Sequence, residues 1–336
     1  MSDRIPLSPP FIAPVCSNIE RPLWSVMIPC YNCTKYLRET IESVLVQDPG
    51  PDKMQIEVVD DCSTDADVEA LVAEVGRGRV RYFRQPENRG SLRNFETCIN
   101  RSIGHRVHIL HGDDLIKPGY YDEIEKMFGA YPDAAAAFTG YNYIDENGDR
   151  MYDNDKLSDE PGIVKDWLSE IAQSQKIQSP SIVVKRSVYE EMGSFYAIHY
   201  GEDWVMWVKI SSRYPIVHSP ALLAKYRVHQ SNITGRYFLS GQSMKDIRIA
   251  IGIIQDYLPE DKKAKLKNLA LKNYSKYFAE TSDKVYHEYR KPYLAMRQAI
   301  GALKMHVNGT SLYFVVKIYL KLLFKYKFNA LEARKE

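Results

Sequence analysis

The sequence predicts an α/β fold in which a mostly parallel sheet is flanked by helices. Short apolar stretches of strand length alternate with segments whose apolar residues recur at helical spacing. The apolar run at residues 107–110 ends abruptly in acidic residues, which is typical of a buried parallel strand that delivers carboxylates to the ligand-binding edge of an open sheet. Together these observations favour a doubly wound, Rossmann-like architecture.

The elements of this fold follow one another from residue 24. Residues 24–29 form an apolar strand that stops at Pro29, and Thr34 is placed to N-cap the next helix. The predicted strands lie at residues 24–29, 55–59, 80–83, 107–110, 135–139, 180–185, 215–218 and 222–228. The predicted helices of this part lie at residues 36–47, 68–75, 91–103, 120–130, 187–192 and 201–210.

The other segments depart from this alternation. Residues 1–22 are polar and proline-rich and are expected to form a flexible N-terminal arm, while the polar, acidic residues 141–162 are expected to form a long loop. The rest is predicted to be nearly continuous helix, at residues 243–256, 262–285, 287–305 and 312–328. We therefore expect the arm to be followed by an α/β domain at 23–238 and a basic helical extension at 239–336.

Composition and charge limit the class of protein. With 45% hydrophobic and 26% charged residues, the chain is neither disordered nor fibrous. Its net charge of +2 combines about −8 up to residue 240 with about +10 in the C-terminal helices. The helix at 312–328 has a polar stripe and an opposite apolar stripe, made of Lys317, Lys321 and Lys325 and of Phe314, Ile318, Leu322 and Leu323. This helix is too short to cross a bilayer, so it packs on the α/β domain or lies on a membrane surface.

The five cysteines favour a reducing compartment. They are scattered, and no secretory signal precedes them, so we expect a cytoplasmic protein, with peripheral attachment to the inner face of the plasma membrane as an alternative. Cys30 and Cys33 form a C-x-x-C pair, but the context of a thioredoxin-like site is missing, so a redox role is disfavoured.

Two adjacent carboxylates, Asp113 and Asp114, follow the strand at 107–110. Because such carboxylates repel each other, a site that keeps both ionised usually holds a cation as well. Taken alone, a turn before Pro118 explains them equally well.

Four motifs occur in a fixed order along the chain. They are SVMIPCYN at residues 25–32, VVDDCSTD at 58–65, HGDD at 111–114 and GEDW at 201–204. As a set they resemble the family 2 glycosyltransferases of GT-A fold, from about residue 23 to about residue 235. The resemblance implies an inverting, metal-dependent enzyme that moves a sugar from a nucleotide-diphosphate sugar to a hydroxyl group of a glycan, lipid-linked or other acceptor. The C-terminal helices carry no such resemblance.

The resemblance implies a nucleotide pocket lined by Pro29, Tyr31 and Asn32. Asp61 would accept the N3–H of a uracil or thymine ring, which implies a UDP- or dTDP-type donor. Capping of the following helix is the structural alternative for Asp61. Arg89 is expected to contact the base or the phosphates.

The resemblance also implies a divalent cation, Mn²⁺ or Mg²⁺, that neutralises the departing diphosphate. Asp113 and Asp114 would hold the cation, and Asp113 would also face the donor. His111 stands where the family carries an aspartate; it is either a ligand, which favours Mn²⁺, or a contact to the ribose or the sugar. His229 is a further candidate ligand of the cation or the diphosphate.

Asp203 corresponds to the catalytic base of the family. It lies at a predicted helix start, where the ionised form of an acid is favoured, and Glu202 and Trp204 are candidate acceptor contacts. The alternative is that both acids only stabilise the start of the helix.

Two other functions are alternatives to the transfer of a sugar. A nucleotidyltransferase would need a glycine-rich first turn, and residues 30–33 contain no glycine. A catalytically degenerate nucleotide-sugar-binding subunit of a glycan assembly complex is the main alternative, because His111 replaces the expected acid. By family analogy we expect a role in polysaccharide assembly, and no nucleic-acid partner.

Overall fold

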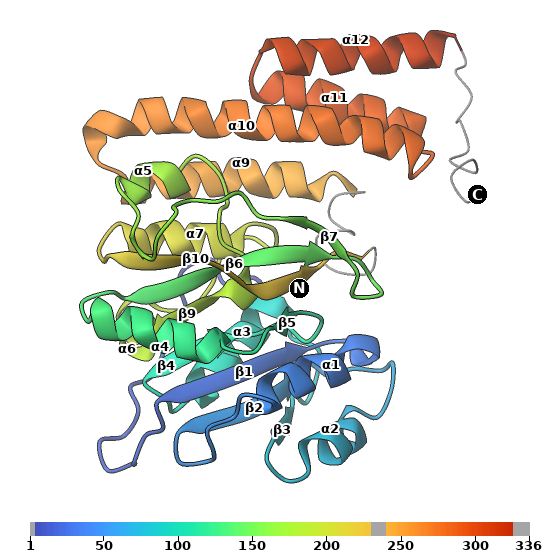
Figure 1. Ribbon diagram of the computed structural model, residues 1–336. Helices are drawn as coiled ribbons and strands as arrows, with labels where there is room; N and C mark the ends of the chain where they lie inside the picture. The colour runs from blue at the N-terminus through green and yellow to red at the C-terminus, as the bar shows by residue number, and fades with distance from the viewer. Residues whose placement is uncertain (1–3, 230–239, 325–336) are drawn as a thin grey trace. The chain divides into compact units, whose positions relative to one another are not determined.

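The computed structural model describes residues 4–229 and 240–324 of the chain (Figure 1). The chain divides into an α/β unit, residues 1–168 and 175–229, and a helical unit, residues 169–174 and 230–336. The predicted boundary at residues 238 and 239 lies outside the described residues. The division into domains at 23–238 and 239–336 therefore stays a prediction.

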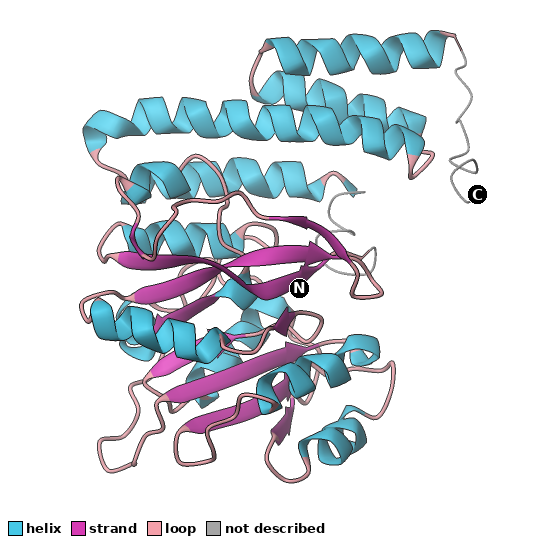
Figure 2. Cartoon of the chain, viewed as in Figure 1, coloured by secondary structure: helices cyan, strands magenta, loops and turns pink. Residues whose placement is uncertain are grey.

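The α/β unit is built on a ten-stranded sheet with helices around it (Figure 2). The strand order is β3-β2-β1-β4-β9-β6-β10-β5, with β7 paired to β6 and β8 paired to β10. β1 runs parallel to β2 and β4, β2 to β3, and β6 to β10, whereas β9 is antiparallel to both of its neighbours. The strands are β1 (Trp24–Cys30), β2 (Met54–Asp60), β3 (Arg81–Arg84), β4 (Arg106–Ile109), β5 (Leu115–Ile116), β6 (Ala136–Ile144), β7 (Arg150–Asp153), β8 (Gly162–Ile163), β9 (Ile182–Lys185) and β10 (Ile216–Arg227).

Side chains on the two faces of β1 pack against different helices. Trp24, Val26 and Ile28 share a hydrophobic cluster with residues of α1, α2 and α4. Because successive side chains of a strand alternate, Ser25 faces the other side, where its hydroxyl accepts the Gly104 N–H at 2.8 Å, just after α3. The helices of the unit are α1 (Thr34–Leu45), α2 (Val68–Gly76), α3 (Ser91–Arg101), α4 (Tyr120–Ala130), α5 (Trp167–Ile171), α6 (Arg186–Met192) and α7 (Glu202–Ser211), of which α5 continues into residues of the helical unit.

The predicted α/β class is confirmed, and the elements predicted between residues 24 and 130 have ends within two residues of those observed. Three local predictions were wrong. Cys33, not Thr34, is the N-cap of α1, and the Thr34 hydroxyl instead donates to the Asp65 carboxylate. Residues 141–162 are not one long loop, because they contain the end of β6, all of β7 and the start of β8. The two strands predicted at 215–218 and 222–228 form one strand, β10, with register shifts after Ser219.

The segment expected as a flexible arm makes specific contacts from residue 4 onward. The Pro10 carbonyl accepts the Ser194 N–H at 3.0 Å, and Ile12 is fully buried. The Arg21 guanidinium donates to the Gly104 carbonyl at 2.9 Å. The proline-rich composition did not indicate these contacts.

The helical unit contains four long helices, counted over its described residues. They are α9 (Gln242–Ile254), α10 (Glu260–His287), α11 (Pro292–Met305) and α12 (Gly309–Leu323). The break between α10 and α11 comes at Pro292, which opens α11 as its first residue. None of the described helices is both long enough and apolar enough to cross a membrane.

Candidate active site

Three loops meet where β1, β2 and β4 end. The Cys30 carbonyl accepts the Asp61 N–H at 2.8 Å, and the Pro29 carbonyl accepts the Gly112 N–H at 3.1 Å. The loops that follow these parallel strands therefore form one edge of the sheet, the position at which open α/β folds bind ligands. The sequence predicted this meeting of the first three motifs.

The loop after β1 carries Tyr31 and Asn32, which follow Pro29. Asn32 adopts a left-handed backbone conformation, with φ of 50°, which asparagine tolerates better than most residues. Its N–H donates to the Ser63 hydroxyl at 3.0 Å, and its side-chain oxygen accepts the Thr64 N–H at 2.8 Å. Asn32 thus ties two loops together, while the Tyr31 side chain is 44% exposed.

Asp61 is buried and holds the loop that precedes α3. Its Oδ1 accepts the Arg89 N–H at 2.7 Å, and its Oδ2 accepts the Gly90 N–H at 2.8 Å and the Asn88 side-chain amide at 2.9 Å. Burial raises the pKa of Asp61, although the two backbone N–H groups oppose the rise. Asp61 does not cap α2, because Asp67 does so through the Ala70 N–H.

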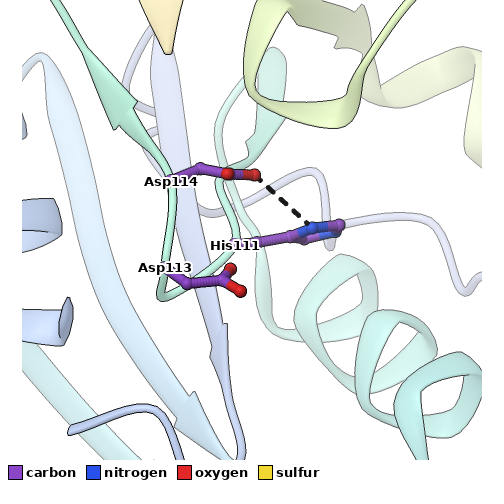
Figure 3. Close-up of side chains that lie close together, drawn as sticks. All are labelled: His111, Asp113 and Asp114. Carbon is purple, nitrogen blue, oxygen red and sulfur yellow. Dashed lines mark ion pairs between the residues drawn. The ribbon is translucent and has the colours of Figure 1, made fainter. Parts of the chain in front are cut away.

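His111, Asp113 and Asp114 form a compact group in the loop between β4 and β5 (Figure 3). One ligand atom from each lies within 4.8 Å of the others, and His111 Nδ1 is 3.7 Å from Asp114 Oδ2. An imidazole and two carboxylates are a donor set that Mn²⁺ accepts readily and Mg²⁺ less so. The structure therefore brings together the three residues that the sequence indicated for a cation.

Asp113 and Asp114 are held by the end of β10. The Arg227 N–H donates to Asp114 Oδ1 at 2.8 Å, and the Arg227 Nε donates to the Asp113 carbonyl at 2.9 Å. His229 Nε2 lies 2.9 Å from Asp113 Oδ2, so this histidine, expected as a cation or diphosphate ligand, contacts a carboxylate of the group. The same Arg227 guanidinium pairs with Glu39 of α1 at 2.6 Å.

The pKa shifts of Asp113 and Asp114 indicate whether a cation suits this group of residues. Burial and the neighbouring charge of Asp113 raise the pKa of Asp114 well above its usual value. Burial also acts on Asp113, but the hydrogen bond from His229 and the nearby His111 outweigh it and lower the pKa. Asp114 Oδ2 is buried and has no hydrogen-bond partner among the described residues. A divalent cation would satisfy this oxygen and offset the repulsion between the two acids. The three residues are therefore suited to bind such a cation.

Gly112 is required by the close approach of this loop to the end of β1. A Cβ added at Gly112 would lie 2.8 Å from the Cys33 Sγ and 3.2 Å from the Pro29 carbonyl oxygen. A larger residue would push the carboxylates that follow away from β1. Neither Cys33 nor Cys30 is in a disulfide.

Asp203 lies in the first turn of α7. Its Oδ1 accepts the Trp204 N–H at 2.7 Å. Burial raises the pKa of Asp203 to about 6, against the hydrogen bonds from the Trp204 N–H and the Gln175 side chain. The expectation that the helix start would favour the ionised form gave the wrong direction, because burial outweighs the helix terminus. A carboxylate with this pKa is ionised near neutral pH and is more basic than an ordinary aspartate.

The two neighbours of Asp203 differ in exposure. Glu202 is partly exposed in the first turn of α7 and remains a candidate acceptor contact. Trp204 is fully buried, and so is Trp207 at 2% exposure. The expectation that Trp204 binds acceptor was therefore wrong, since it has no exposed ring face on which a sugar can stack.

A series of aromatic rings links the cation group to α7. His111 stacks on Phe95 of α3, with centroids 5.3 Å apart and planes 3° from parallel. Phe95 contacts Phe195 edge-on at 5.4 Å, and Phe195 contacts Trp207 at 5.9 Å. These contacts fix the helix that carries Asp203 relative to the loop that carries His111.

Sequence reasoning missed two residues of this site. The Asn88 amide and the Gln175 side chain hold Asp61 and Asp203, but both lie in irregular segments without a periodic signal. Asn94 of α3 is a buried amide that donates to the Val59 carbonyl at 2.8 Å.

The family described as "Glycosyl transferase family 2" matches residues 25–193, about half of the chain. An uncharacterized glycosyltransferase of Rickettsia felis is 30% identical over 207 residues, which cover 61% of this chain and 33% of that protein. A putative teichuronic acid biosynthesis glycosyltransferase of Bacillus subtilis is 33% identical over 131 residues, covering 38% of this chain and 50% of that protein. The chain thus spans about a third to a half of the length of these relatives.

Solved structures share the fold over most of the chain. Residues 1–349 of S. aureus TarS, in complex with UDP-GlcNAc, match with a TM-score of 0.64 and 15% identity, covering 92% of this chain and 94% of that one. A mannosyltransferase from Pyrobaculum calidifontis, in complex with GDP-Man and Mn²⁺, matches with a TM-score of 0.54 and 16% identity, covering 95% and 84%. At this level of identity the likeness is one of fold.

Proposed function

Because the chain belongs to family 2 of the glycosyltransferases, we propose that it transfers a sugar from a nucleotide-diphosphate sugar to an acceptor hydroxyl, with inversion at the anomeric carbon. The observation that carries this proposal is the group of His111, Asp113 and Asp114, with its unsatisfied buried oxygen, at the edge where β1 and β2 also end. A catalytically degenerate subunit would have no need to keep such an oxygen. The proposal covers this chain alone, since the matched segments span about a third to a half of the Rickettsia and Bacillus relatives.

The donor is proposed to bind at the loops after β1 and β2. Pro29, Tyr31 and Asn32 would line the nucleotide pocket, and Arg89 would contact the base or phosphates. Asp61 Oδ1 accepts one hydrogen bond within the chain, and a carboxylate oxygen accepts two, so it retains capacity for the N3–H of a uracil or thymine ring. This supports a UDP- or dTDP-type donor, and the UDP-GlcNAc bound to TarS agrees with it.

Asp113, Asp114 and His111 are the proposed ligands of Mn²⁺ or Mg²⁺, with His229 beside them on Asp113. Such a cation, when bound, neutralises charge on the departing diphosphate. The imidazole favours Mn²⁺, and the Mn²⁺ bound to the Pyrobaculum mannosyltransferase is consistent with that choice.

Asp203 is the proposed general base. It takes the proton of the acceptor hydroxyl as that oxygen forms its bond to the anomeric carbon. The bond from this carbon to the diphosphate breaks on the opposite side, and its electron pair leaves with the nucleoside diphosphate. A pKa of about 6 suits a base that acts near neutral pH.

The acceptor is proposed to be a glycan or a lipid-linked glycan, with Glu202 as a contact. A succinoglycan biosynthesis protein of Rhizobium meliloti, 27% identical over 219 residues that cover 60% of this chain and 61% of that protein, supports a role in polysaccharide assembly. We also propose that the enzyme acts in the cytoplasm, at the inner face of the plasma membrane, through its basic C-terminal helices.

The role of Asp203 is tested by Asp203→Asn, with Glu202→Gln as the matched control one residue away. A thermal-shift screen of UDP-, dTDP- and GDP-sugars with Mn²⁺ first identifies the donor. For Asp203→Asn we expect the turnover number to fall about 100- to 10,000-fold with donor affinity unchanged, because only proton transfer is lost. For Glu202→Gln we expect mainly a higher KM for the acceptor. Full turnover by Asp203→Asn contradicts the base assignment.

A further inference from the structure

α12 is apolar on the side that packs against its own unit. Val315, Ile318 and Leu322 belong to a cluster with residues of α10 and α11, and Ile318 is fully buried. Asn308 caps the helix by accepting the Ser311 N–H at 3.0 Å. These contacts explain the apolar residues on the inward side of α12, but not those on its outward side.

The lysines of α12 lie toward α10. Lys317 Nζ pairs with Asp283 Oδ2 at 2.8 Å, and Lys321 Nζ pairs with Asp283 Oδ1 at 2.5 Å. Their side chains are only 30% and 14% exposed. The sequence expectation that these two lysines form a polar stripe opposite the packed apolar face was therefore wrong; Lys325 lies outside the described residues.

The outward side of α12 is an exposed apolar stripe. Its residues recur at helical spacing and are 43–58% exposed: Leu312, Tyr313, Val316, Tyr319, Leu320 and Leu323. Figure 1 shows α12 with α10 and α11 beside it on one side. Contiguous exposed apolar residues on a folded protein commonly mark an interaction surface, so this outer stripe indicates a surface that meets another apolar phase.

The charge around this stripe identifies what covers it. Residues 289–324, which include α11 and α12, contain no aspartate or glutamate, and besides Lys317 and Lys321, which pair with Asp283, they carry four exposed basic residues: Arg290, Lys291, Arg297 and Lys304. A second copy of the chain would bring the same positive charge against this face, whereas an anionic lipid surface would attract it. Tyr313 and Tyr319 have an apolar ring and a polar hydroxyl, the combination that prefers a membrane–water interface.

We infer that the outward stripe of α12 docks on an anionic lipid bilayer, with the helix lying in the plane of the interface. The inference deepens the proposed attachment to the membrane and is independent of the sugar that is transferred. Leu312, Val316, Tyr319 and Leu323 enter the boundary between headgroups and acyl chains. The basic residues of α11 supply the electrostatic attraction, while Lys317 and Lys321 hold α12 to α10.

The test is flotation of the full chain with vesicles of phosphatidylcholine containing phosphatidylglycerol, and with phosphatidylcholine alone. The variant replaces Val316, Leu320 and Leu323 by glutamine, which keeps helical propensity. The matched control replaces Val46, Met151 and Ile249, three exposed apolar residues outside α12, by glutamine. We expect the variant's partition coefficient on anionic vesicles to fall at least about tenfold, with the control unchanged and neutral vesicles binding weakly.

Three results overturn the inference: no binding of the wild-type chain to anionic vesicles, equal binding of the variant, or a dimer in light scattering that the variant abolishes. Donor-induced stabilisation in the thermal-shift assay is measured for the same proteins. If the variant retains this stabilisation but leaves the vesicles, the docking face is separate from the transferase site. Failure of the wild-type chain to bind any nucleotide sugar contradicts the proposed function and leaves the docking result standing.

Discussion

Asp61 and Asp114 follow β2 and β4, the two strands on either side of β1, and both are buried, yet their surroundings differ. Asp61 accepts three hydrogen bonds from residues 88–90, two of them from backbone N–H groups. Asp114 accepts one, from the Arg227 N–H, and its other oxygen has no hydrogen-bond partner among the described residues while it lies near Asp113 and His111.

The difference shows that the hydrogen-bond donors around an acid at a strand end decide its role. An acid with enough donors stabilises the fold, and one with too few is suited to bind a ligand. Asp61 has enough internal donors to justify its burial without a ligand. Asp114 has a buried oxygen whose burial is costly unless something positive binds it. The contrast therefore predicts different effects of mutation at the two sites on stability and on metal binding.

The largest effect is expected on transfer when Asp114 is changed. Asp114→Asn keeps the hydrogen bond from Arg227 but removes a charged ligand, so we expect the rate at saturating donor and Mn²⁺ to fall at least about a hundredfold. EDTA treatment of the wild-type chain should cause a loss of similar size, reversed by Mn²⁺. A wild-type rate in the variant, or a wild-type rate that EDTA does not change, would contradict the role of Asp114 as a cation ligand.

The next effect concerns stability and has opposite signs at the two sites. Asp61→Ala leaves two backbone N–H groups without their acceptor and should lower the free energy of unfolding by about 3 kcal/mol. Asp114→Asn removes a charge beside Asp113 and should leave that free energy unchanged or raise it by about 1 kcal/mol. Urea unfolding without metal measures both. Equal destabilisation would show that Asp114 is also structural.

Much of the α/β unit could be predicted because its signals are local. Strands up to β4 are short apolar runs, and the acids that follow them mark the edge at which the site forms. β7 was missed because its four residues are mostly exposed and do not alternate between apolar and polar, and it is a strand only through pairing with β6. β10 was split at Pro220, whose missing N–H is tolerated at the register shift.

The remaining errors concern partners far apart in the sequence. The lysines of α12 were assigned to a solvated face, since nothing near them in the sequence points to Asp283. Likewise, the burial that raises the pKa of Asp203 depends on how α7 packs, which a helix-start pattern does not report. Periodicity gives the apolar positions of a helix, and tertiary contacts decide which of them face outward.

The smallest effect sharpens the role of the third acid, Asp203. Because the base acts in its ionised form, kcat/KM should fall about tenfold for each pH unit below about 6 and level off above it. Gln175→Leu removes a hydrogen bond that lowers the pKa of Asp203, so the acid limb should move to higher pH by less than about one unit. The pH profile of both proteins checks this. An unmoved profile would assign the limb to another group.

The most direct test of the cation group is the binding of Mn²⁺ alone, followed by electron paramagnetic resonance of the free ion. Wild-type chain and Asp61→Asn should each bind one ion with similar affinity, whereas Asp114→Asn should bind at least about tenfold more weakly. If Asp114→Asn binds Mn²⁺ as tightly as the wild-type chain, the unsatisfied oxygen of Asp114 is not a ligand and the account of this site is contradicted.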